Sequence, residues 1–424
     1  QVAVVERSSM MYGGTCPNIA CIPTKTLVHE AGIAALLYHD DYPKQANLYK
    51  QAIGRKNRLT SFLRNNNYER LSKRPNVMVY TGEGSFVSAN IIKVALPEGD
   101  IELQGKEIFI NTGSTPIIPA IDGIKESQKV YTSTTLLDLN VLPQHLIIVG
   151  GGYIGLEFAS VFSAFGSEVT VLEYAKEVLP HFDSDLAKRL RQSLGKRGIK
   201  IETQAAVKSI AKEGDGLAVA YERKGKEQSV TADKVLMAVG RRANVGTLNL
   251  ADIGVEFSPR GIAVDGNMQT NVPHVYAVGD VNGLMMLAHA ATFQGIRALD
   301  TIMGVDDNLR LDVIPAAVFT MPEVGMVGLT EDDCKAQGIE YVAKKAFFRA
   351  NGKAVCLDET DGYCKLIAAA DGRLLGCHIY GPHAADLVQE ACALITRGDS
   401  IADLQGIVHS HPTLSEIVQS AAHC

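Results

Sequence analysis

The residues of this chain whose type and spacing point most directly to chemistry are two cysteines, Cys16 and Cys21. On an undistorted helix their spacing separates the Cα atoms by roughly 8.6 Å, whereas a disulfide tolerates at most about 7 Å. If the two bond, the backbone between them must be bent, and Pro17 and Pro23 are residues that could bend it. A strained, exposed disulfide is readily reduced. The pair therefore indicates thiol–disulfide chemistry, with two free thiols on a helix as the alternative.

A histidine close to the other end of the sequence could serve such chemistry. His411 is followed by a proline, and Glu416 stands five positions after the histidine. Attack of a thiolate on a disulfide releases a second thiolate, which must take up a proton near neutral pH. A histidine steadied by a carboxylate meets that need, although a lone histidine before proline is usually a loop residue. We interpret two further histidines, His289 and His409, as packing or supporting residues.

A glycine-rich turn in the middle of the chain points to a dinucleotide. Gly150, Gly152 and Gly155 follow the apolar run 146–149 and precede a helical pattern over 156–165. Glycines at this spacing let the backbone approach a pyrophosphate at a helix N-terminus. A glycine triplet alone is a weak signal, but here the flanking strand and helix supply the context that the motif needs. The turn therefore predicts a nicotinamide dinucleotide site.

The acidic residue that ends the next strand-like segment, Glu173, indicates which dinucleotide is bound. A carboxylate at this position accepts hydrogen bonds from the adenosine 2'-hydroxyl and repels a 2'-phosphate. A site for the phosphorylated cofactor is expected to carry arginines instead. The residues that follow are Tyr174, Ala175 and Lys176, without an arginine. The sequence therefore favours NAD(H).

The first residues of the chain indicate a second dinucleotide site. Residues 1–6 read as a buried parallel strand closed by an acid, Glu6. A dinucleotide fold presents its glycine turn roughly 20 residues upstream of such an acid, and here no such turn precedes it. We expect that the sequence lacks its natural first strand, phosphate loop and helix. A fold that never had them is the alternative.

Composition narrows the class of protein. A chain of 424 residues can form two or three domains, and its net charge of -6 shows no basic excess that would suggest nucleic acid or a membrane surface. No apolar run approaches the length of a membrane span and no signal peptide is evident, which favours a soluble, cytoplasmic protein. Eight cysteines do not form a disulfide scaffold, and those outside the pair show no metal spacing.

Apolar patterning places helices and strands around these residues. A helix is expected to continue from the cysteines through position 36, followed by a polar stretch at about 40–50 and a second helix that ends near 73. One small sheet is then expected from four strand-like segments, namely 76–80, 84–86, 91–95 and 107–113. An α+β unit is expected from about 311, with strands at 316–319, 325–328, 364–368 and 374–379 and helices around 332 and 386–395.

These motifs, together with the Gly-Asp pair that ends the segment 270–280, resemble the class I pyridine nucleotide-disulfide oxidoreductases. That family includes dihydrolipoyl dehydrogenase, glutathione reductase and mercuric reductase, and the resemblance runs along the whole chain. It implies an α/β fold with two Rossmann-like three-layer dinucleotide-binding domains plus a C-terminal α+β dimerisation domain. The resemblance implies an FAD-binding domain in two parts, at 1–115 and 240–310. It implies an NAD-binding domain at 116–239 and a dimerisation domain at 311–424.

The resemblance also implies roles for the catalytic residues. Cys16 is the expected interchange thiol that attacks the disulfide substrate, and Cys21 the thiol that faces the flavin. His411, oriented by Glu416, is the expected acid–base catalyst and serves the cysteine pair of the partner subunit in a homodimer. The chain departs from the family's pattern inside the bridge, because Ala20 replaces the usual glycine and a proline replaces an apolar residue. These departures bear on the redox potential of the pair.

FAD and NAD are the cofactors that the resemblance implies. Lys25 is expected to pair with Glu157 beside the flavin, and Tyr153 to gate the nicotinamide pocket. The cofactor-binding residues are expected to be Glu6, Gly14, Thr15, Lys25, Gly84, Thr112, Gly113, Gly150, Gly152, Tyr153, Ile154, Gly155, Glu173, Gly240, Asp280 and Ala288. No metal ligand is expected.

Three functions remain open at this stage. The stretch around Leu287 to His289 most resembles dihydrolipoyl dehydrogenase, which favours an NADH:disulfide oxidoreductase acting on a small dithiol or disulfide, with a lipoyl-bearing protein as a partner. The segments 10–14 and 26–29 instead resemble the flavoenzymes of reactive-chlorine resistance, which favours reduction of a small oxidant or a metal ion. Mercuric reductase is only a minor alternative, because mercuric reductases have a terminal pair of cysteines and this chain has the single Cys424 near that position. A third possibility is a chain that binds no FAD and is an inert folded dimer.

Overall fold

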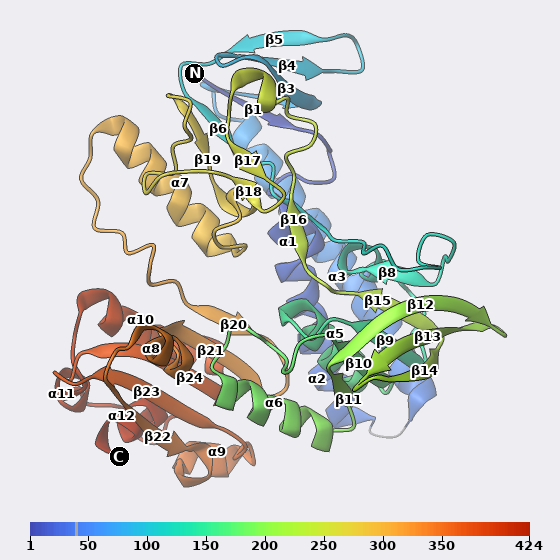
Figure 1. Ribbon diagram of the computed structural model, residues 1–424, viewed down its shortest axis with the longest axis vertical. Coiled ribbons are helices and arrows are strands. Elements are labelled where there is room, and N and C mark those ends of the chain that lie inside the picture. The colour runs from blue at the N-terminus through green and yellow to red at the C-terminus, as the bar shows by residue number, and fades with distance from the viewer. Residues whose placement is uncertain (39–40) are drawn as a thin grey trace.

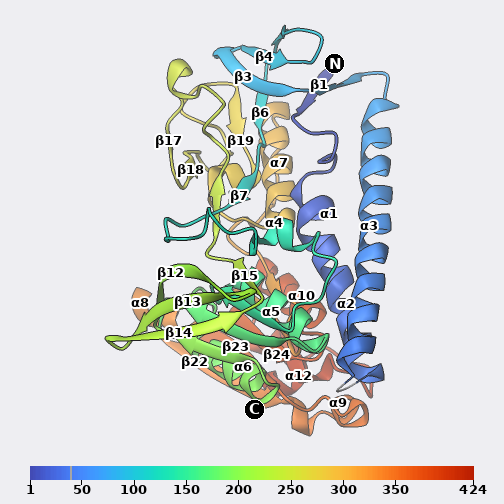
Figure 2. The same ribbon diagram turned by 90° about the vertical axis from the view of Figure 1, so that its right-hand side faces the viewer.

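The computed structural model describes residues 1–38 and 41–424. An upper lobe holds the N-terminus and a broader lower part holds the C-terminus (Figure 1). One long helix, α3 (Tyr42–Ser72), runs along the side of both parts (Figure 2). No helix among the described residues is long and apolar enough to cross a membrane.

The cysteines lie on two consecutive helices, α1 (Thr15–Ile19) and α2 (Cys21–Leu37), which are separated by Ala20 with φ -143° and ψ -98°. Pro17 and Pro23 each occupy the third position of a helix, where the missing N–H would have had no helical acceptor. The expected bend between the cysteines is thus present. Ala20 makes the bend, and each of the two helices has a proline in its first turn, Pro17 before the bend and Pro23 after it.

The second helix begins earlier than expected, because α3 starts at Tyr42, within the polar stretch expected at about 40–50. Asp41 caps this helix by accepting from the backbone N–H of Lys44 at 3.2 Å, and Pro43 lies in the first turn. These are start signals for a helix, which outweigh the polar composition. Asp40 lies outside the described residues. The expected helix end near 73 agrees with Ser72.

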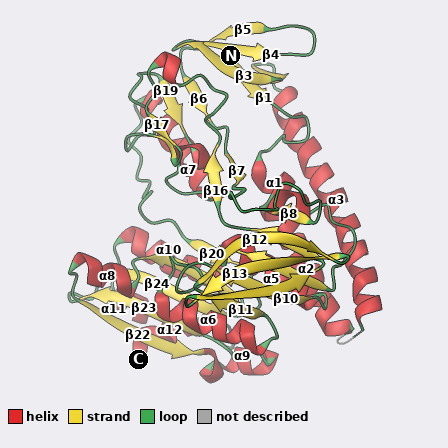
Figure 3. Cartoon of the chain, turned by 45° about the vertical axis from the view of Figure 1, so that its right-hand side comes forward, coloured by secondary structure: helices red, strands yellow, loops and turns green. Residues whose placement is uncertain are grey.

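The upper lobe contains several small sheets (Figure 3). Its parallel pairs are β1 (Val2–Glu6) with β2 (Val77–Thr81), and β6 (Ile108–Ile110) with β19 (Val275–Ala277). One of its antiparallel sheets joins β3 (Glu83–Ser88), β4 (Ile91–Ala95) and β5 (Ile101–Gln104). Other elements here are η1 (Ala251–Ile253), β17 (Phe257–Ser258), β18 (Gly261–Ile262), η2 (Gly279–Asn282) and α7 (Ala288–Met303). The expected single small sheet is therefore wrong, because β2 and β6 pair with strands distant in sequence.

The glycine turn belongs to a parallel five-stranded sheet of order β11-β10-β9-β15-β8. Its strands are β8 (Val130–Thr132), β9 (His145–Val149), β10 (Glu168–Glu173), β11 (Lys200–Thr203) and β15 (Lys234–Met237). The helices are α4 (Ser133–Leu136), α5 (Tyr153–Ala164) and α6 (Ser184–Lys196). Strand order reverses at β9, and the carboxyl end of a strand at such a point is where open α/β sheets bind ligands.

An antiparallel sheet covers this unit and two short strands connect it to the upper lobe. The antiparallel sheet consists of β12 (Ala205–Glu213), β13 (Gly216–Arg223) and β14 (Lys226–Ala232). The connecting strands β7 (Ser114–Pro116) and β16 (Arg241–Ala243) pair antiparallel with each other. The segment between β7 and β16 thus leaves and re-enters the upper lobe at one place.

The C-terminal part is an antiparallel five-stranded sheet of order β20-β21-β24-β23-β22. The strands are β20 (Ala316–Val318), β21 (Glu323–Gly328), β22 (Tyr341–Phe347), β23 (Tyr363–Ala369) and β24 (Leu374–Gly381). The helices are α8 (Glu331–Gln337), η3 (Phe348–Ala350), α9 (Gly352–Leu357), α10 (Ala384–Arg397), α11 (Ile401–Gln405) and α12 (Glu416–His423). The α+β character agrees with the expectation.

Candidate functional site

The two cysteines lie at one large cavity of about 3510 Å³. This is several times the volume of roughly 300–1,000 Å³ that is typical of small-molecule sites, so it has room for more than one large ligand. The predicted cofactor residues that line it are Glu6, Gly14, Thr15, Lys25, Gly84, Thr112, Gly113, Gly150, Gly152, Tyr153, Ile154, Glu173, Gly240, Asp280 and Ala288. Gly155 is not among the lining residues, nor are His411 and Glu416.

Cys16 and Cys21 are free thiols, so the structure shows the dithiol form of the pair. A hydrogen bond from Cys16 to Cys21 is the main reason why the pKa of Cys21 is lowered to about 7, and the positive charge of Lys25 lowers the pKa further. The same hydrogen bond, together with burial, raises the pKa of Cys16. Of the two thiols, Cys21 is therefore the one that loses its proton more readily.

Lys25 and Glu157 form an ion pair beside the thiols, as the resemblance implies. The Nζ atom of Lys25 donates to Oε1 and Oε2 of Glu157 at 2.9 and 2.8 Å. The two residues meet because α2 packs against α5. The Glu157 side chain is only 8 % exposed and the Lys25 side chain 32 %. The backbone N–H of Phe319, to which the sequence analysis gives no role, also donates to Oε1 of Glu157 at 3.0 Å.

The glycine turn after β9 fits a pyrophosphate. A Cβ atom at Gly155 would stand 2.0 Å from the carbonyl oxygen of Gly150, so this glycine serves close packing within the turn. A Cβ at Gly152 would meet nothing within 4 Å, and Gly152 lines the cavity where α5 begins without a side-chain cap. The first N–H groups of α5 are therefore free to bind an anionic group.

Glu173 lies at the end of β10 with only 9 % of its surface exposed. Its Oε1 atom accepts from the backbone N–H of Ala175 at 2.6 Å, and its Oε2 atom accepts from Gly151. These bonds fix the carboxylate at the cavity and leave acceptor positions for ribose hydroxyls. Tyr153 also lines the cavity, and its ring contacts Phe182 edge-on at 5.2 Å. This end of the cavity fits NAD(H).

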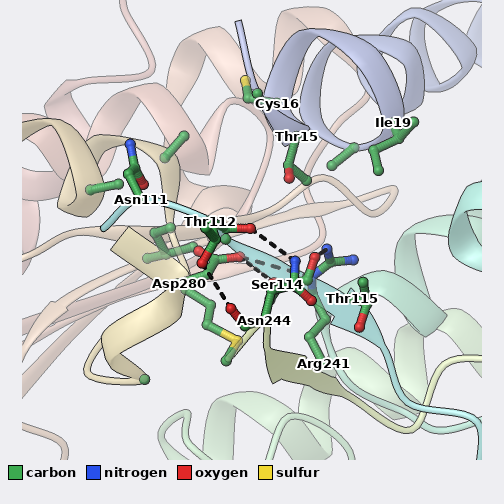
Figure 4. A pocket seen from close by; sticks show the side chains of 18 of the residues that line it. Thr15, Cys16, Ile19, Asn111, Thr112, Ser114, Thr115, Arg241, Asn244 and Asp280 are labelled. Atoms are coloured by element: carbon green, nitrogen blue, oxygen red, sulfur yellow. Dashed lines mark hydrogen bonds and ion pairs between the residues drawn. The ribbon is translucent and has the colours of Figure 1, made fainter. Parts of the chain in front are cut away.

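A partly buried group of polar side chains at the same cavity holds Asp280 (Figure 4). The hydroxyl of Ser114 donates to Asp280, and Nε of Arg241 donates to the same hydroxyl at 2.7 Å. Figure 4 shows these three side chains directed toward one another, with Thr15 and Cys16 on the facing side. Burial lowers the pKa of Arg241, which the negative charges of Asp280 and Cys21 oppose.

Two hydrogen bonds, each from a side chain to a backbone carbonyl, join the two chain segments that connect the lobes next to this group. The Thr112 hydroxyl donates to the carbonyl of Asn244 at 2.8 Å, and the Asn244 side chain donates to the carbonyl of Thr112 at 2.9 Å. Ser114, Arg241 and Asn244 have no role in the sequence analysis. The available signal was the Gly-Arg-Arg-Ala-Asn segment 240–244, of which only Gly240 is predicted there to bind a cofactor.

The remaining residues predicted for FAD lie along the same cavity. Oε1 of Glu6 accepts from the backbone N–H of Ser8 at 3.0 Å, so the carboxylate is fixed at the end of β1. Gly84 lies against this strand, because a Cβ there would stand 3.3 Å from Val5. Ala288 is the first residue of α7, which begins without a side-chain cap. These features fit FAD, which Glu6, Gly84, Asp280 and Ala288 would hold.

His411 and Glu416 form a pair away from this cavity. The Nδ1 atom of His411 lies 3.0 Å from Oε1 of Glu416, and Oε2 of Glu416 accepts from the backbone N–H of Thr413 at 2.8 Å. The bond from Thr413 and the bond from His411 lower the pKa of Glu416. The His411 side chain is 76 % exposed. Within one chain, the pair is therefore free to face another molecule.

The two other histidines make local contacts. His409 is 5 % exposed at its side chain, and its Nε2 atom lies 2.8 Å from Oε1 of Glu390. The Nε2 atom of His289 lies 2.7 Å from the carbonyl oxygen of Pro315. Across the two described ranges, no group of three or more His, Cys, Asp or Glu side chains is arranged to hold a metal ion.

Fold and site together define a dinucleotide-dependent thiol oxidoreductase, and comparison with known proteins makes the family specific. Residues 1–295 match the description "Pyridine nucleotide-disulphide oxidoreductase", and residues 314–422 match its dimerisation domain. The chain belongs to this family. It is an oxidoreductase that uses FAD and NAD(H), and it acts on a dithiol or disulfide as a homodimer.

Individual relatives agree with this assignment. The chain is 36 % identical to dihydrolipoyl dehydrogenase of Geobacillus stearothermophilus, over 100 % of this chain and 90 % of the relative. It is 37 % identical to dihydrolipoyl dehydrogenase of Bacillus subtilis with the same coverage. Among solved structures, the Cu(II) complex of the HOCl-induced flavoprotein disulfide reductase RclA from Escherichia coli superposes with a TM-score of 0.90 and 33 % identity, covering 100 % of this chain and 93 % of RclA.

Proposed function

We propose that this protein is an NADH:disulfide oxidoreductase of the dihydrolipoyl dehydrogenase type. The observation that carries the proposal is the Cys16–Cys21 dithiol at the large cavity, with the Lys25–Glu157 ion pair beside it. FAD and NAD(H), when bound, supply two-electron transfer to and from the cysteine pair. The remaining chemistry is thiol–disulfide exchange by the protein's own residues.

Reduction of a disulfide substrate proceeds in two exchanges. The Cys16 thiol gives its proton to the partner's His411 and attacks one sulfur of the substrate, a Cys16–substrate bond forms, the substrate sulfur–sulfur bond breaks, and the second substrate sulfur leaves as a thiolate that takes that proton. The Cys21 thiolate then attacks Cys16, the intramolecular disulfide forms, and the first substrate sulfur leaves. The pair is oxidised and the substrate disulfide is reduced. Oxidation of a dithiol such as dihydrolipoamide reverses both exchanges.

Proton transfer in this scheme is the role of the partner's His411. His411 has an exposed imidazole and does not line the cavity of its own subunit. Both observations support action on another subunit. The bond to Glu416 fixes the Nδ1 side of the ring and leaves Nε2 for the substrate sulfur or for Cys16. The match to a dimerisation domain over residues 314–422 supports the same arrangement.

The proposal includes a division of labour along the chain. Residues 1–115 and 240–310 bind FAD, residues 116–239 bind NAD(H), and residues 311–424 form the dimer. The two connecting strands β7 and β16, which pair at the passage between the lobes, support the first two of these assignments. The names of the relatives, dihydrolipoyl dehydrogenase, support lipoamide as the physiological substrate. A lipoyl-bearing protein is the proposed carrier, and the cytoplasm is the proposed location.

An alternative function is reduction of a small oxidant or metal ion. The RclA structure, which is described as HOCl-induced and as a Cu(II) complex, favours this alternative because it superposes over the whole chain. Both functions use the same cavity and the same cysteine pair. They differ in the molecule that accepts electrons.

Turnover with defined acceptors distinguishes the two functions. The purified chain is assayed for NADH oxidation with lipoamide, with a hypohalous-acid-derived oxidant, with Cu(II) and with Hg(II), and the Cys16→Ser and Cys21→Ser variants are the controls. Cysteine-dependent turnover with lipoamide that exceeds the other acceptors supports the proposed function. Turnover with an oxidant or a metal alone supports the alternative. A flavin-free absorbance spectrum with no turnover would identify an inert dimer and contradict both.

A further inference from the structure

Phe319, the residue directly after strand β20, contacts both members of the Lys25–Glu157 ion pair. Its backbone N–H donates to Oε1 of Glu157 at 3.0 Å. Its ring lies under the Lys25 ammonium, with Nζ 4.4 Å from the ring centre. Two independent contacts, one from the backbone and one from the side chain, therefore converge on a single ion pair.

Three parts of the chain meet at this point. Lys25 lies on α2 and Glu157 on α5, whereas Phe319 belongs to the C-terminal part, whose strand β20 contacts α5. The Glu157 carboxylate accepts two bonds from Lys25 and one from Phe319, and its side chain is only 8 % exposed. With these bonds in place the carboxylate cannot rotate away, so the ammonium is held on one side by Glu157 and on another by the ring.

We propose that Phe319 is a positioning residue, which holds the Lys25 ammonium beside Cys21. The negative face of an aromatic ring attracts a cation without carrying a net charge. A further carboxylate at this place would compete with the Cys21 thiolate for the ammonium. The ring secures the lysine and leaves its charge available to the thiolate.

The charges around Cys21 show what the position of Lys25 does. The Cys16 thiol and the Lys25 ammonium stabilise the Cys21 thiolate, while burial and the Glu157 carboxylate oppose it. The Arg241 guanidinium also interacts with the Cys21 charge. If Lys25 leaves its place, one of the two nearby cations is lost and the Cys21 thiolate becomes harder to form.

The test measures the pKa of Cys21 in the full chain. The inference rests on the proposed role of Cys21, but the measurement requires neither bound flavin nor turnover, so its failure is distinct from failure of the proposed function. The reduced protein is exposed to a short pulse of iodoacetamide between pH 5 and 10, and mass spectrometry quantifies alkylation at Cys21 separately from Cys16. Phe319→Leu keeps an apolar cover, and Phe319→Tyr keeps the ring as the matched control.

Phe319→Leu is expected to raise the pKa of Cys21 by roughly 0.3–0.7 units, which corresponds to a cation–π contact at a partly exposed site. Phe319→Tyr is expected to leave the pKa unchanged. In a Lys25→Gln background, which keeps a hydrogen-bond donor for Glu157, Phe319→Leu is expected to have no further effect.

An unchanged pKa in Phe319→Leu, or an equal shift in the Lys25→Gln background, would overturn the inference. The first result would mean that the ring does not hold the lysine, and the second that Phe319 acts without it. Thermal unfolding checks that each variant is folded. Should Phe319→Leu fail to fold, Phe319→Met provides the same comparison.

Discussion

The Nδ1 atom of His411 lies 3.0 Å from Oε1 of Glu416, yet neither residue lines the cavity at which the thiols lie. The pair is assembled within one subunit, on the short segment that leads into α12, and the imidazole faces outward. A proton donor built in this way is ready before any second subunit arrives. Its target must come from another molecule.

Replacement of His411 by Gln is expected to lower lipoamide turnover by about 10²–10⁴-fold, which is the usual contribution of a general acid–base group. Entry of electrons from NADH is expected to be unaffected, because His411 does not line the cavity. Stopped-flow absorbance and steady-state assays measure the two steps separately. A variant that loses both equally would contradict the assignment.

Mixed dimers test whether His411 acts across subunits. Co-expression of Cys16→Ser with His411→Gln produces heterodimers in which one of the two sites keeps both native residues. We expect these heterodimers to recover about half of the activity per dimer, whereas each variant alone is inactive. If the heterodimer isolated with two affinity tags stays inactive, the histidine and the thiol belong to the same subunit.

Alkylation at Cys21 is expected to be half-maximal near pH 7, because the Cys16 hydrogen bond and the Lys25 charge lower the pKa of Cys21 to about 7. Below this pH the sulfur is protonated and reacts slowly, and above it the thiolate dominates. Cys16→Ala removes the hydrogen bond and is expected to move the midpoint toward higher pH. Cys356, an exposed thiol on α9, is an internal reference whose midpoint should not move.

Glu173→Ser is expected to raise the KM for NADH by roughly 10–100-fold, since a carboxylate that accepts hydrogen bonds contributes about 1.5–3 kcal/mol. The loss of negative charge should also improve the relative use of NADPH. Glu177→Gln is the matched control, because Glu177 pairs with Arg191 and does not line the cavity. Equal changes in the KM for NADH and NADPH would show that Glu173 supports the fold and does not distinguish the two cofactors at the ribose.

The parts of this structure that sequence predicts well are those set by neighbouring residues. Strand β9, the glycine turn and helix α5 follow one another along the chain, so periodicity and glycine spacing were sufficient. Strand β22 was missed because two adjacent lysines, Lys344 and Lys345, interrupt its apolar pattern. The prediction of one small sheet is wrong because β2 pairs with β1, a strand that lies far from it in the sequence.

Contacts between distant residues account for the rest of what was missed. Lys25 and Glu157 were paired through resemblance to a family and not through spacing, since 132 positions separate them. Phe319 reaches Glu157 across 162 positions through a backbone N–H, a group that every residue except proline has. Arg241 reaches Ser114 across 127 positions. No pattern within a local window contains such information.

A buried lysine links the dinucleotide-binding unit to the C-terminal sheet. Lys365 on β23 is fully buried, and its Nζ atom donates to Asp183 at 2.5 Å and to Glu331 at 2.6 Å. Asp183 is itself 1 % exposed and caps α6. Lys365 lowers the pKa of both carboxyl groups, against the effect of burial.

Lys365→Met is expected to destabilise the protein by about 3–5 kcal/mol at neutral pH, because it leaves the buried Asp183 carboxylate and the half-buried Glu331 carboxylate without a counter-charge. Lys73→Met is the control, since its pair with Glu69 is exposed and contributes at most about 1 kcal/mol. Thermal unfolding midpoints measure both.

The stability difference between wild type and Lys365→Met is expected to depend on pH, because Lys365 lowers the pKa of Asp183 and Glu331. Carboxyl groups with a lowered folded pKa contribute stability above their unfolded pKa and lose it as the pH falls through the folded pKa. In Lys365→Met the unpaired carboxylates of Asp183 and Glu331 instead gain from protonation, so the gap between variant and wild type is expected to narrow as the pH falls from 7 toward 4. A gap that stays constant over this range would show that Lys365 contributes by packing and not by its charge.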